Sequence, residues 1–347
     1  MAGRVGDPSR APVAFGRRAV PQLFEQLQRP AAGGRLPALN SLCDLMHNPE
    51  LLYQAATGGF LEQLKVLFQD ENPAVRTKTC ELLHTLTTHY IGRQALLSSS
   101  LLPPLCQLLD DPSSSCRKNV HRVLNHLSLL PAGAQALLTL VPHLMLKLRE
   151  EEEEEVQVLL LSTLTSCSTL DALPALASDA VSLLGHKLGH RSPNIRREAA
   201  AALMALSVCD DGKRQVCEEA VLPVLVGLLK DEDVEVQANA AGVIMYTAIT
   251  TAGKQQCLNL DVIPVLLHLV SKKEDDEEEM DEERRRRMKA LVLYSLRALT
   301  ALAEAPDGRR LLLEQLPLLV VRSEAAEEDQ DIKRAAQTAV GVISWTP

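Results

Sequence analysis

Aromatic side chains are scarce in this sequence: Phe, Trp and Tyr together make up 3% of its 347 residues, although hydrophobic residues reach 46%. Strands favour β-branched and aromatic residues, whereas helices packed on helices are rich in Leu and Ala. Leu, Ala and Val dominate the hydrophobic residues here. The composition therefore predicts an all-α fold.

An excess of positive charge is also missing. The formal net charge is -9 and the sequence pI is about 5.6, whereas proteins that track phosphates need clustered excess Lys and Arg. No stretch approaches the roughly 20 apolar residues that span a bilayer, and the start, MAGRVGDPSRAP, has no apolar secretion segment. We expect a soluble intracellular protein that binds neither nucleic acid nor membranes.

Closely spaced metal ligands are lacking, because no C-x-x-C pair occurs. His186 and His190 stand four residues apart, but Gly185 and Gly189 are expected to break that helix, and no third ligand is in register. We therefore expect no metal site, and reduced thiols that lie mostly in helix packing. The cysteines are Cys43, Cys80, Cys106, Cys116, Cys167, Cys209, Cys217 and Cys257.

Catalytic signatures are absent as well. No G-x-S-x-G nucleophile turn occurs, and DDGKRQ at Asp210 lacks the first glycine and the hydroxyl of a phosphate-binding loop. The sequence therefore predicts no enzyme, no cofactor and no small-molecule substrate.

An internal repeat is the strongest feature that is present. A motif of the form apolar, Pro, x, Leu, x, x, Leu recurs, for example as LPPLCQLL from Leu102 and LPVLVGLL from Leu222. Proline is tolerated in a first helical turn, where its missing N–H has no intrahelical partner. The Leu positions are then expected to face inward. The second position of the motif falls at Pro21, Glu62, Pro103, Pro142, Ser182, Pro223, Pro264 and Pro317.

Two further anchors keep the same period. One opens an Ala/Leu-rich stretch and falls at Arg35, Arg76, Arg117, Gln157, Arg196 and Gln237. The other is a turn with a glycine at Gly92, Gly212, Gly253 and Gly308. We expect these glycines to supply the positive φ of a helix exit. Each unit then consists of two main helices and a short one.

A period of about 41 residues indicates armadillo or HEAT repeats, which bury their apolar faces only by stacking. The Pro-bearing helix, the Arg or Gln anchor and the Gly-Lys/Arg turn resemble armadillo repeats more than HEAT repeats. We expect residues 1–14 to be disordered or extended, and residues 15–347 to form one solenoid of about eight repeats of 40–42 residues. An insertion at 272–287 in repeat seven forms either a flexible loop or a helix extended into solvent.

Several segments resemble a particular family more closely: AFGRRAVPQLFEQLQ, SLCDLMHNPE, THYIGR, LAEAPDGRRLL and KRAAQTAVGVISW. They are similar to the radial spoke head 14 homologues, armadillo-repeat proteins of cilia and flagella. This resemblance implies a structural subunit of the axonemal radial spoke that supports ciliary and sperm flagellar motility. It also implies other spoke subunits as partners, and a location in the cytoplasm, in the cytoskeleton of the cilium or flagellum axoneme.

Armadillo proteins of the importin-alpha and catenin type clamp peptides with a ladder of Asn, often with a Trp one turn earlier. Neither residue occurs at those positions here, so the amide grip on a peptide backbone is lost. The residues in their place are mostly small and predict a shallow trough for a partner, or an unused face of good helix formers. The candidate partner-binding residues are Arg122, His126, Ser162, Ser166, Ala201, Ala205, Gly242 and Tyr246.

Two interpretations of function follow. The first is a non-enzymatic scaffold subunit of a large assembly, and the alternative is a free cytosolic adaptor that binds signalling or transport partners in its concave groove. The acidic run Glu150–Glu155 is either a solvated corner between helices or a docking patch.

Overall fold

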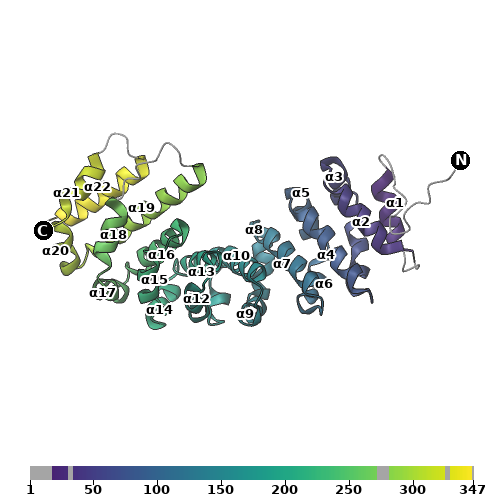
Figure 1. The fold of residues 1–347 in the computed structure, drawn as a ribbon, viewed down its shortest axis with the longest axis horizontal. Helices are drawn as coiled ribbons and strands as arrows, with labels where there is room; N and C mark the ends of the chain where they lie inside the picture. Colours follow the sequence, from purple (N-terminus) through teal and green to yellow (C-terminus); the bar gives the residue numbers. More distant parts are fainter. Residues whose placement is uncertain (1–17, 30–33, 272–280, 325–328, 346–347) are drawn as a thin grey trace. The chain divides into compact units, whose positions relative to one another are not determined.

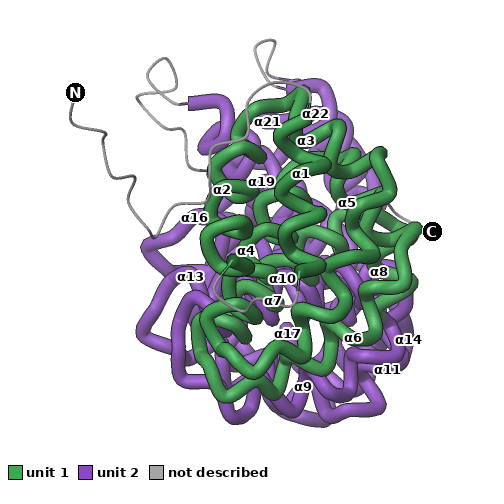
Figure 2. The backbone as a smooth tube through the Cα atoms, turned by 90° about the vertical axis from the view of Figure 1, so that its right-hand side faces the viewer, with its two compact units in different colours: residues 1–137 green, residues 138–347 purple. Residues whose placement is uncertain are grey.

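A computed structural model of the chain describes residues 18–29, 34–271, 281–324 and 329–345. Every regular element within these ranges is a helix, and none is a strand (Figure 1). The all-α prediction is confirmed. The chain divides into two compact units, residues 1–137 and 138–347 (Figure 2). The extended segment predicted for residues 1–14 lies outside the described residues, and the single array over 15–347 stays a prediction.

In the first unit, two or more short helices separate consecutive long helices. Its elements are α1 (Ala19–Leu27), α2 (Arg35–Leu45), α3 (Pro49–Thr57), the 3-10 helix η3 (Leu61–Gln69), α4 (Pro73–Thr87), α5 (Tyr90–Leu97), α6 (Leu102–Gln107), η4 (Leu108–Asp110), α7 (Ser114–Ser128) and α8 (Pro131–Leu137).

The second unit continues the same pattern. Its elements are η5 (Leu138–Leu140), α9 (Val141–Glu150), α10 (Glu154–Leu170), α11 (Leu173–Leu176), α12 (Ala180–Leu188), α13 (Pro193–Leu206), α14 (Asp210–Glu218), α15 (Leu222–Leu228), α16 (Val234–Thr247), α17 (Thr251–Asn259), α18 (Val262–Ser271), α19 (Glu282–Leu302), α20 (Pro306–Leu313), α21 (Leu316–Glu324) and α22 (Gln330–Ser344).

The long helices form the spine of each unit. In the first unit α2 packs on α4 and α4 on α7; in the second, α10, α13, α16, α19 and α22 pack side by side in that order. Their apolar residues interlock with the Pro-bearing helices, so that Leu144, Leu225 and Leu266 are fully buried. Because a helix pair buries only part of its apolar surface, this stacking supplies the core of each unit.

The sequence signals for helix starts are confirmed. Pro103, Pro142 and Pro223 lie in the first turns of α6, α9 and α15. Side-chain oxygens cap the long helices, as where Asn72 accepts from the backbone N–H of Ala74 and Asp233 accepts from Glu235 and Val236. In the insertion, residues 272–280 lie outside the described residues, and α19 begins at Glu282.

The Arg anchors Arg35, Arg76 and Arg196 link consecutive repeats. Arg76 donates from Nη1 to the carbonyl of Asp70, just before its own helix, and from Nε to Asp111 Oδ2 at 2.6 Å in the next repeat. Arg196 repeats this pattern with Asp231, at 2.8 Å from Nε and 3.0 Å from Nη2. The Asp111 carboxylate in turn accepts from the N–H of Ser113, and so fixes the entry of the next long helix.

The repeated glycines have a different role from the one predicted. They lie inside α5, α14, α17 and α20, and Gly59 is the one glycine of positive φ among the described residues. A Cβ added at these glycines would lie 1.9–2.2 Å from a carbonyl oxygen near the end of the preceding long helix. Glycine is therefore required by close helix crossing. Gly133, which the sequence analysis did not include, makes the same close crossing. Among the described residues the crossing glycines are Gly92, Gly133, Gly212, Gly253 and Gly308.

Candidate functional site

Most of the predicted partner-binding residues lie on three neighbouring long helices of the second unit. Because α10, α13 and α16 pack side by side, their equivalent turns form a continuous surface. The residues concerned are Ser162 and Ser166 on α10, Ala201 and Ala205 on α13, and Gly242 and Tyr246 on α16. All are half-buried except Gly242, which is buried.

The buried Gly242 corrects part of the trough prediction. A Cβ at this position would lie 2.2 Å from Met204 Sδ and 3.4 Å from Tyr294 Cδ2. Met204 and Tyr294, from α13 and α19, therefore cover the glycine, and its short side chain serves helix packing. Sequence reasoning missed this cover because Met204 does not stand at the repeat position that matches Gly242.

The remaining candidates, Arg122 and His126, lie on α7 in the first unit and have partners within it. Arg122 donates to Asn119 Oδ1 at 3.3 Å, and the His126 ring stacks on His84 with centroids 5.0 Å apart. Burial, together with the charge of nearby His84 and Arg93, lowers the pKa of His126 to about 4. His126 is therefore a neutral ring at neutral pH, and it lies 3.1 Å from Thr87 Oγ1.

Two asparagines that the sequence reading did not single out serve the array itself. Asn119 Nδ2 donates to the carbonyl of Thr77 at 3.3 Å, and Asn239 Nδ2 donates to the carbonyl of Arg197 at 3.2 Å. Each bond joins a long helix to the previous one. Their equal spacing of 42 residues from their acceptors is the signal that could have revealed them.

A charged network borders the same long helices where α13, α16 and α19 begin. Arg197 pairs with Asp233 and also lies 3.2 Å from Glu235, which Arg287 approaches to 2.9 Å. Burial and the charge of Glu235 raise the pKa of the neighbouring Glu198 carboxyl. The network ties the three helices together and gives this end of the surface mixed charge.

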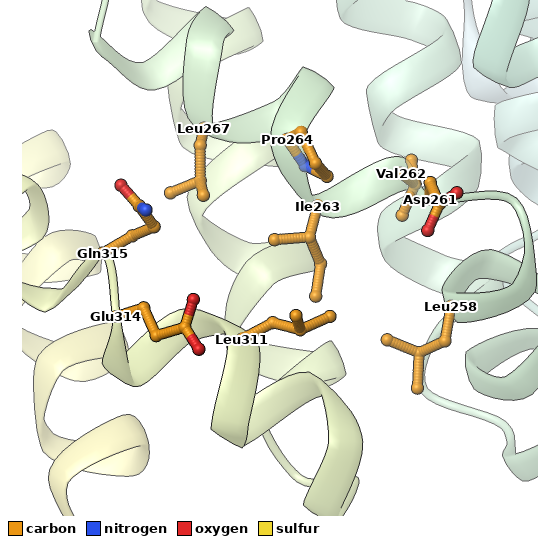
Figure 3. Close-up of a pocket in the computed structure, with 9 residues that line it drawn as sticks. All are labelled: Leu258, Asp261, Val262, Ile263, Pro264, Leu267, Leu311, Glu314 and Gln315. Carbon is orange, nitrogen blue, oxygen red and sulfur yellow. The ribbon is translucent and has the colours of Figure 1, made fainter.

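A separate pocket opens in the second unit between α17–α18 and α20–α21. Its volume is about 390 Å³, toward the lower end for ligand pockets. Ile263 and Leu267 form buried walls, and Leu311 is 43% exposed at the mouth. Figure 3 shows Glu314 and Asp261 on opposite sides, with Ile263 and Leu311 between them.

The chemically reactive side chains are occupied in packing. All eight cysteines are free thiols; burial raises the pKa of Cys43 and of Cys257 to about 12, so both remain protonated. The predicted break is wrong at Gly185, which lies inside α12, and correct at Gly189, which caps the end of α12, so His190 lies beyond the helix. Within the described ranges, no group of three or more His, Cys, Asp or Glu could hold a metal ion.

The acidic run Glu150–Glu155 joins the end of α9 to the start of α10. Glu154 begins α10 and accepts from Ser192 and Asn194, and these hydrogen bonds lower its pKa. Glu152 and Glu155 are exposed.

Across the part of the chain that the structure covers, no helix combines the length and apolarity needed to cross a bilayer.

Known families and structures support the repeat architecture. A family model for the non-SMC mitotic condensation complex subunit 1 matches residues 45–175, and a HEAT-repeat model matches residues 141–245. Each covers less than half of the chain.

Two solved structures agree. An engineered protein from a structural-genomics project is similar with a TM-score of 0.75 at 18% identity, over 95% of this chain and 89% of its own. A designed armadillo repeat protein has a TM-score of 0.61 at 22% identity, over 66% of this chain and 99% of its own. The armadillo/HEAT-type fold is confirmed, and the chain is a repeat scaffold suited to binding other proteins.

Proposed function

We propose that this armadillo/HEAT-type repeat protein is a non-enzymatic structural subunit of the axonemal radial spoke, located in the cilium or flagellum and supporting its motility. The resemblance of the segments quoted above to radial spoke head 14 homologues supports the assembly. The matched families and structures support only the repeat scaffold.

The structural observation that carries the scaffold role is the surface formed by Ser162, Ser166, Ala201 and Ala205. Their short side chains leave room for a partner to approach the backbones of α10 and α13 closely. The Ser166 hydroxyl already donates to the carbonyl of Ser162 at 3.2 Å, so a partner that covers Ser166 leaves this donor satisfied.

Two bulky substitutions test this surface. Ala201→Trp and Ala205→Trp are expected to abolish incorporation into axonemes while the melting temperature stays unchanged, because both side chains extend into the space a partner would occupy. The matched control is Ala252→Trp on α17, where Ala252 is exposed away from these helices.

Glu152→Lys is expected to alter the association rate and its salt dependence more than final occupancy.

Proximity labelling in a ciliated cell tests the assembly itself. Labelled radial spoke proteins are the expected result. Labelling confined to cytosolic signalling or transport proteins would support the adaptor alternative, in which interfaces of about 1,200–2,000 Å² are typical. Normal incorporation of both Trp variants would instead show that the surface on α10 and α13 is empty in the assembly.

A further inference from the structure

The pocket lies where α17–α18 meets α20–α21, which we call the later junction. The equivalent place one repeat before it, where α14–α15 meets α17–α18, is the earlier junction, and the two differ in their side chains. Gln256 stands three residues after Gly253, and Leu311 stands three residues after Gly308. At the earlier junction Gln256 Nε2 donates to the carbonyl of Cys217 at 3.4 Å and links α17 to α14. The Leu311 side chain has no hydrogen-bond donor, so the later junction lacks the hydrogen bond that Gln256 makes between helices at the earlier one.

The charges at the two junctions also differ. Ala220 and Asp261 occupy equivalent loop positions, with φ of 52° and 50°. Asn259 and Glu314 likewise stand six residues after their crossing glycines. The earlier junction is thus uncharged at two positions where the pocket has carboxylates.

Neither pocket carboxylate is neutralised within the described residues. Asp261 and Glu314 are both exposed, and no ion pair or side-chain hydrogen bond joins either to another residue described. The nearby Arg310 on α20 pairs with Asp307 on the same helix and not with Glu314. Two unpaired carboxylates flank an apolar floor, which is a surface complementary to an apolar group beside a cation.

We propose that this pocket binds a short peptide segment of a partner protein in which one large aliphatic or aromatic side chain is flanked by Lys or Arg. The apolar side chain would fill the space lined by Ile263, Leu267 and Leu311, where a buried anchor contributes most of the binding energy. The flanking cations would pair with Asp261 and Glu314 and speed association. The proposal rests on the scaffold role proposed above, and it is independent of the axonemal location.

Selection from a random peptide library displayed on phage, panned on the purified full-length chain, provides the probe. The expected enriched peptides carry a large apolar residue with Lys or Arg on both sides. Each synthetic peptide is then titrated by fluorescence anisotropy. Leu311→Gln is expected to weaken binding by about tenfold or more, because it replaces an apolar wall of the pocket with a polar amide and supplies the donor that Gln256 provides at the earlier junction.

The charge test uses Asp261→Asn combined with Glu314→Gln. This variant is expected to weaken binding about threefold and to flatten its salt dependence. The matched control, Glu71→Gln with Glu219→Gln, removes the same charge from exposed sites elsewhere and should leave the affinity unchanged. If Leu311→Gln lowers the melting temperature, the charge variant alone decides the test.

Three outcomes would overturn the proposal. They are enriched peptides without basic residues, enriched peptides that bind both pocket variants as tightly as the unaltered chain, and failure to enrich any pocket-dependent peptide. Self-association of the chain that Leu311→Gln abolishes, seen by sedimentation velocity, would assign the pocket to a second copy instead. Because all of these measurements use purified protein, their result is separable from a failure to find the chain in axonemes.

Discussion

The junction between α13 and α16 differs from the junction between α16 and α19 in how the anchor residue is used. Arg196 holds the loop before its own helix, by donating to the carbonyl of His190 at 3.0 Å, and also reaches Asp231 in the next repeat. Gln237 performs only the first task, donating to the carbonyl of Asp231 at 2.7 Å. A guanidinium has five donors on a planar fork, whereas a glutamine amide has two on one nitrogen.

The anchor position therefore has two separable functions: it holds the loop before its own helix, and it links that helix to the next repeat. Where Arg gives way to Gln, the link to the next repeat passes to other residues, and Arg287 on α19 reaches back to Glu235. This change occurs next to the insertion. Gln also replaces Arg at the anchor Gln157, which accepts from Lys187 at 2.6 Å, so the ion pair is lost with the guanidinium and not with the regular spacing.

The largest expected effect concerns packing that both junctions share. Leu225→Ala or Leu266→Ala should each lower the free energy of unfolding by about 2–5 kcal/mol, because both leucines are fully buried. Urea denaturation measures this loss. The control Val224→Ala alters a side chain that is 40% exposed and should cost far less. Losses below about half a kcal/mol at both leucines would contradict the assigned register.

Giving the α13–α16 junction the Gln anchor of the α16–α19 junction tests whether the two functions of the anchor are separable. Arg196→Gln can keep the bond to the His190 carbonyl but leaves the nearly buried Asp231 without its cation, so the expected loss is about 2–3 kcal/mol, below that of a fully buried pair. Arg214→Gln removes an exposed Arg that pairs with Asp211 and Glu218, and should cost less than about 0.5 kcal/mol.

Equal losses in the two Arg variants would show that the Arg–Asp link contributes no more than a surface ion pair. Adding Asp231→Asn to Arg196→Gln should recover part of the loss, because the unpaired carboxylate is then removed. A double-mutant cycle in urea measures the coupling.

The smallest expected effect is a pH dependence of the corresponding link in the first unit. Burial alone would raise the pKa of Asp111, but the hydrogen bonds from Arg76 and from the backbone of Ser113 outweigh it and hold that pKa below its ordinary value. A depressed pKa stabilises the fold above the unfolded-state pKa, and this stability is lost as pH falls through the folded-state value.

The stability gap between the unaltered chain and Asp111→Asn should therefore narrow as the pH is lowered from neutral into the acid range. Unfolding in urea at a series of pH values checks it. A gap that is constant across that range would mean that the Asp111 carboxylate does not titrate as its contacts require.

The sequence predicted the helices well because their signals are local. Pro103 and Pro142 mark helix starts through properties of a single turn, and the Arg76 and Arg196 anchors appeared as a regular period. The partners Asp111 and Asp231 recur 35 residues after those anchors, yet the prediction did not connect them, because a period shows that a position matters and not what it contacts.

The candidate surface could be predicted only in part. The helical periodicity placed Ala201 and Ala205 on one face, and both are half-buried there. The prediction that Gly242 lines an open trough was wrong, because Met204 covers it from a neighbouring helix. Met204 does not occupy the equivalent position of its own repeat. The pocket was not foreseen, since it depends on Leu311 meeting Ile263 across two repeats and on a hydrogen bond that is missing.

The crossing glycines have a genetic consequence. Every missense change at Gly92, Gly133, Gly212, Gly253 or Gly308 adds a Cβ, and each such atom would overlap a carbonyl oxygen. No inherited substitution at these codons can therefore be conservative, however small or uncharged the new residue. At Gly227 and Gly341 a Cβ meets no atom within 4 Å, so the same nucleotide changes there should pass largely unnoticed. Variant interpretation in this gene would accordingly need to weigh a glycine by its place in the repeat rather than by its residue type.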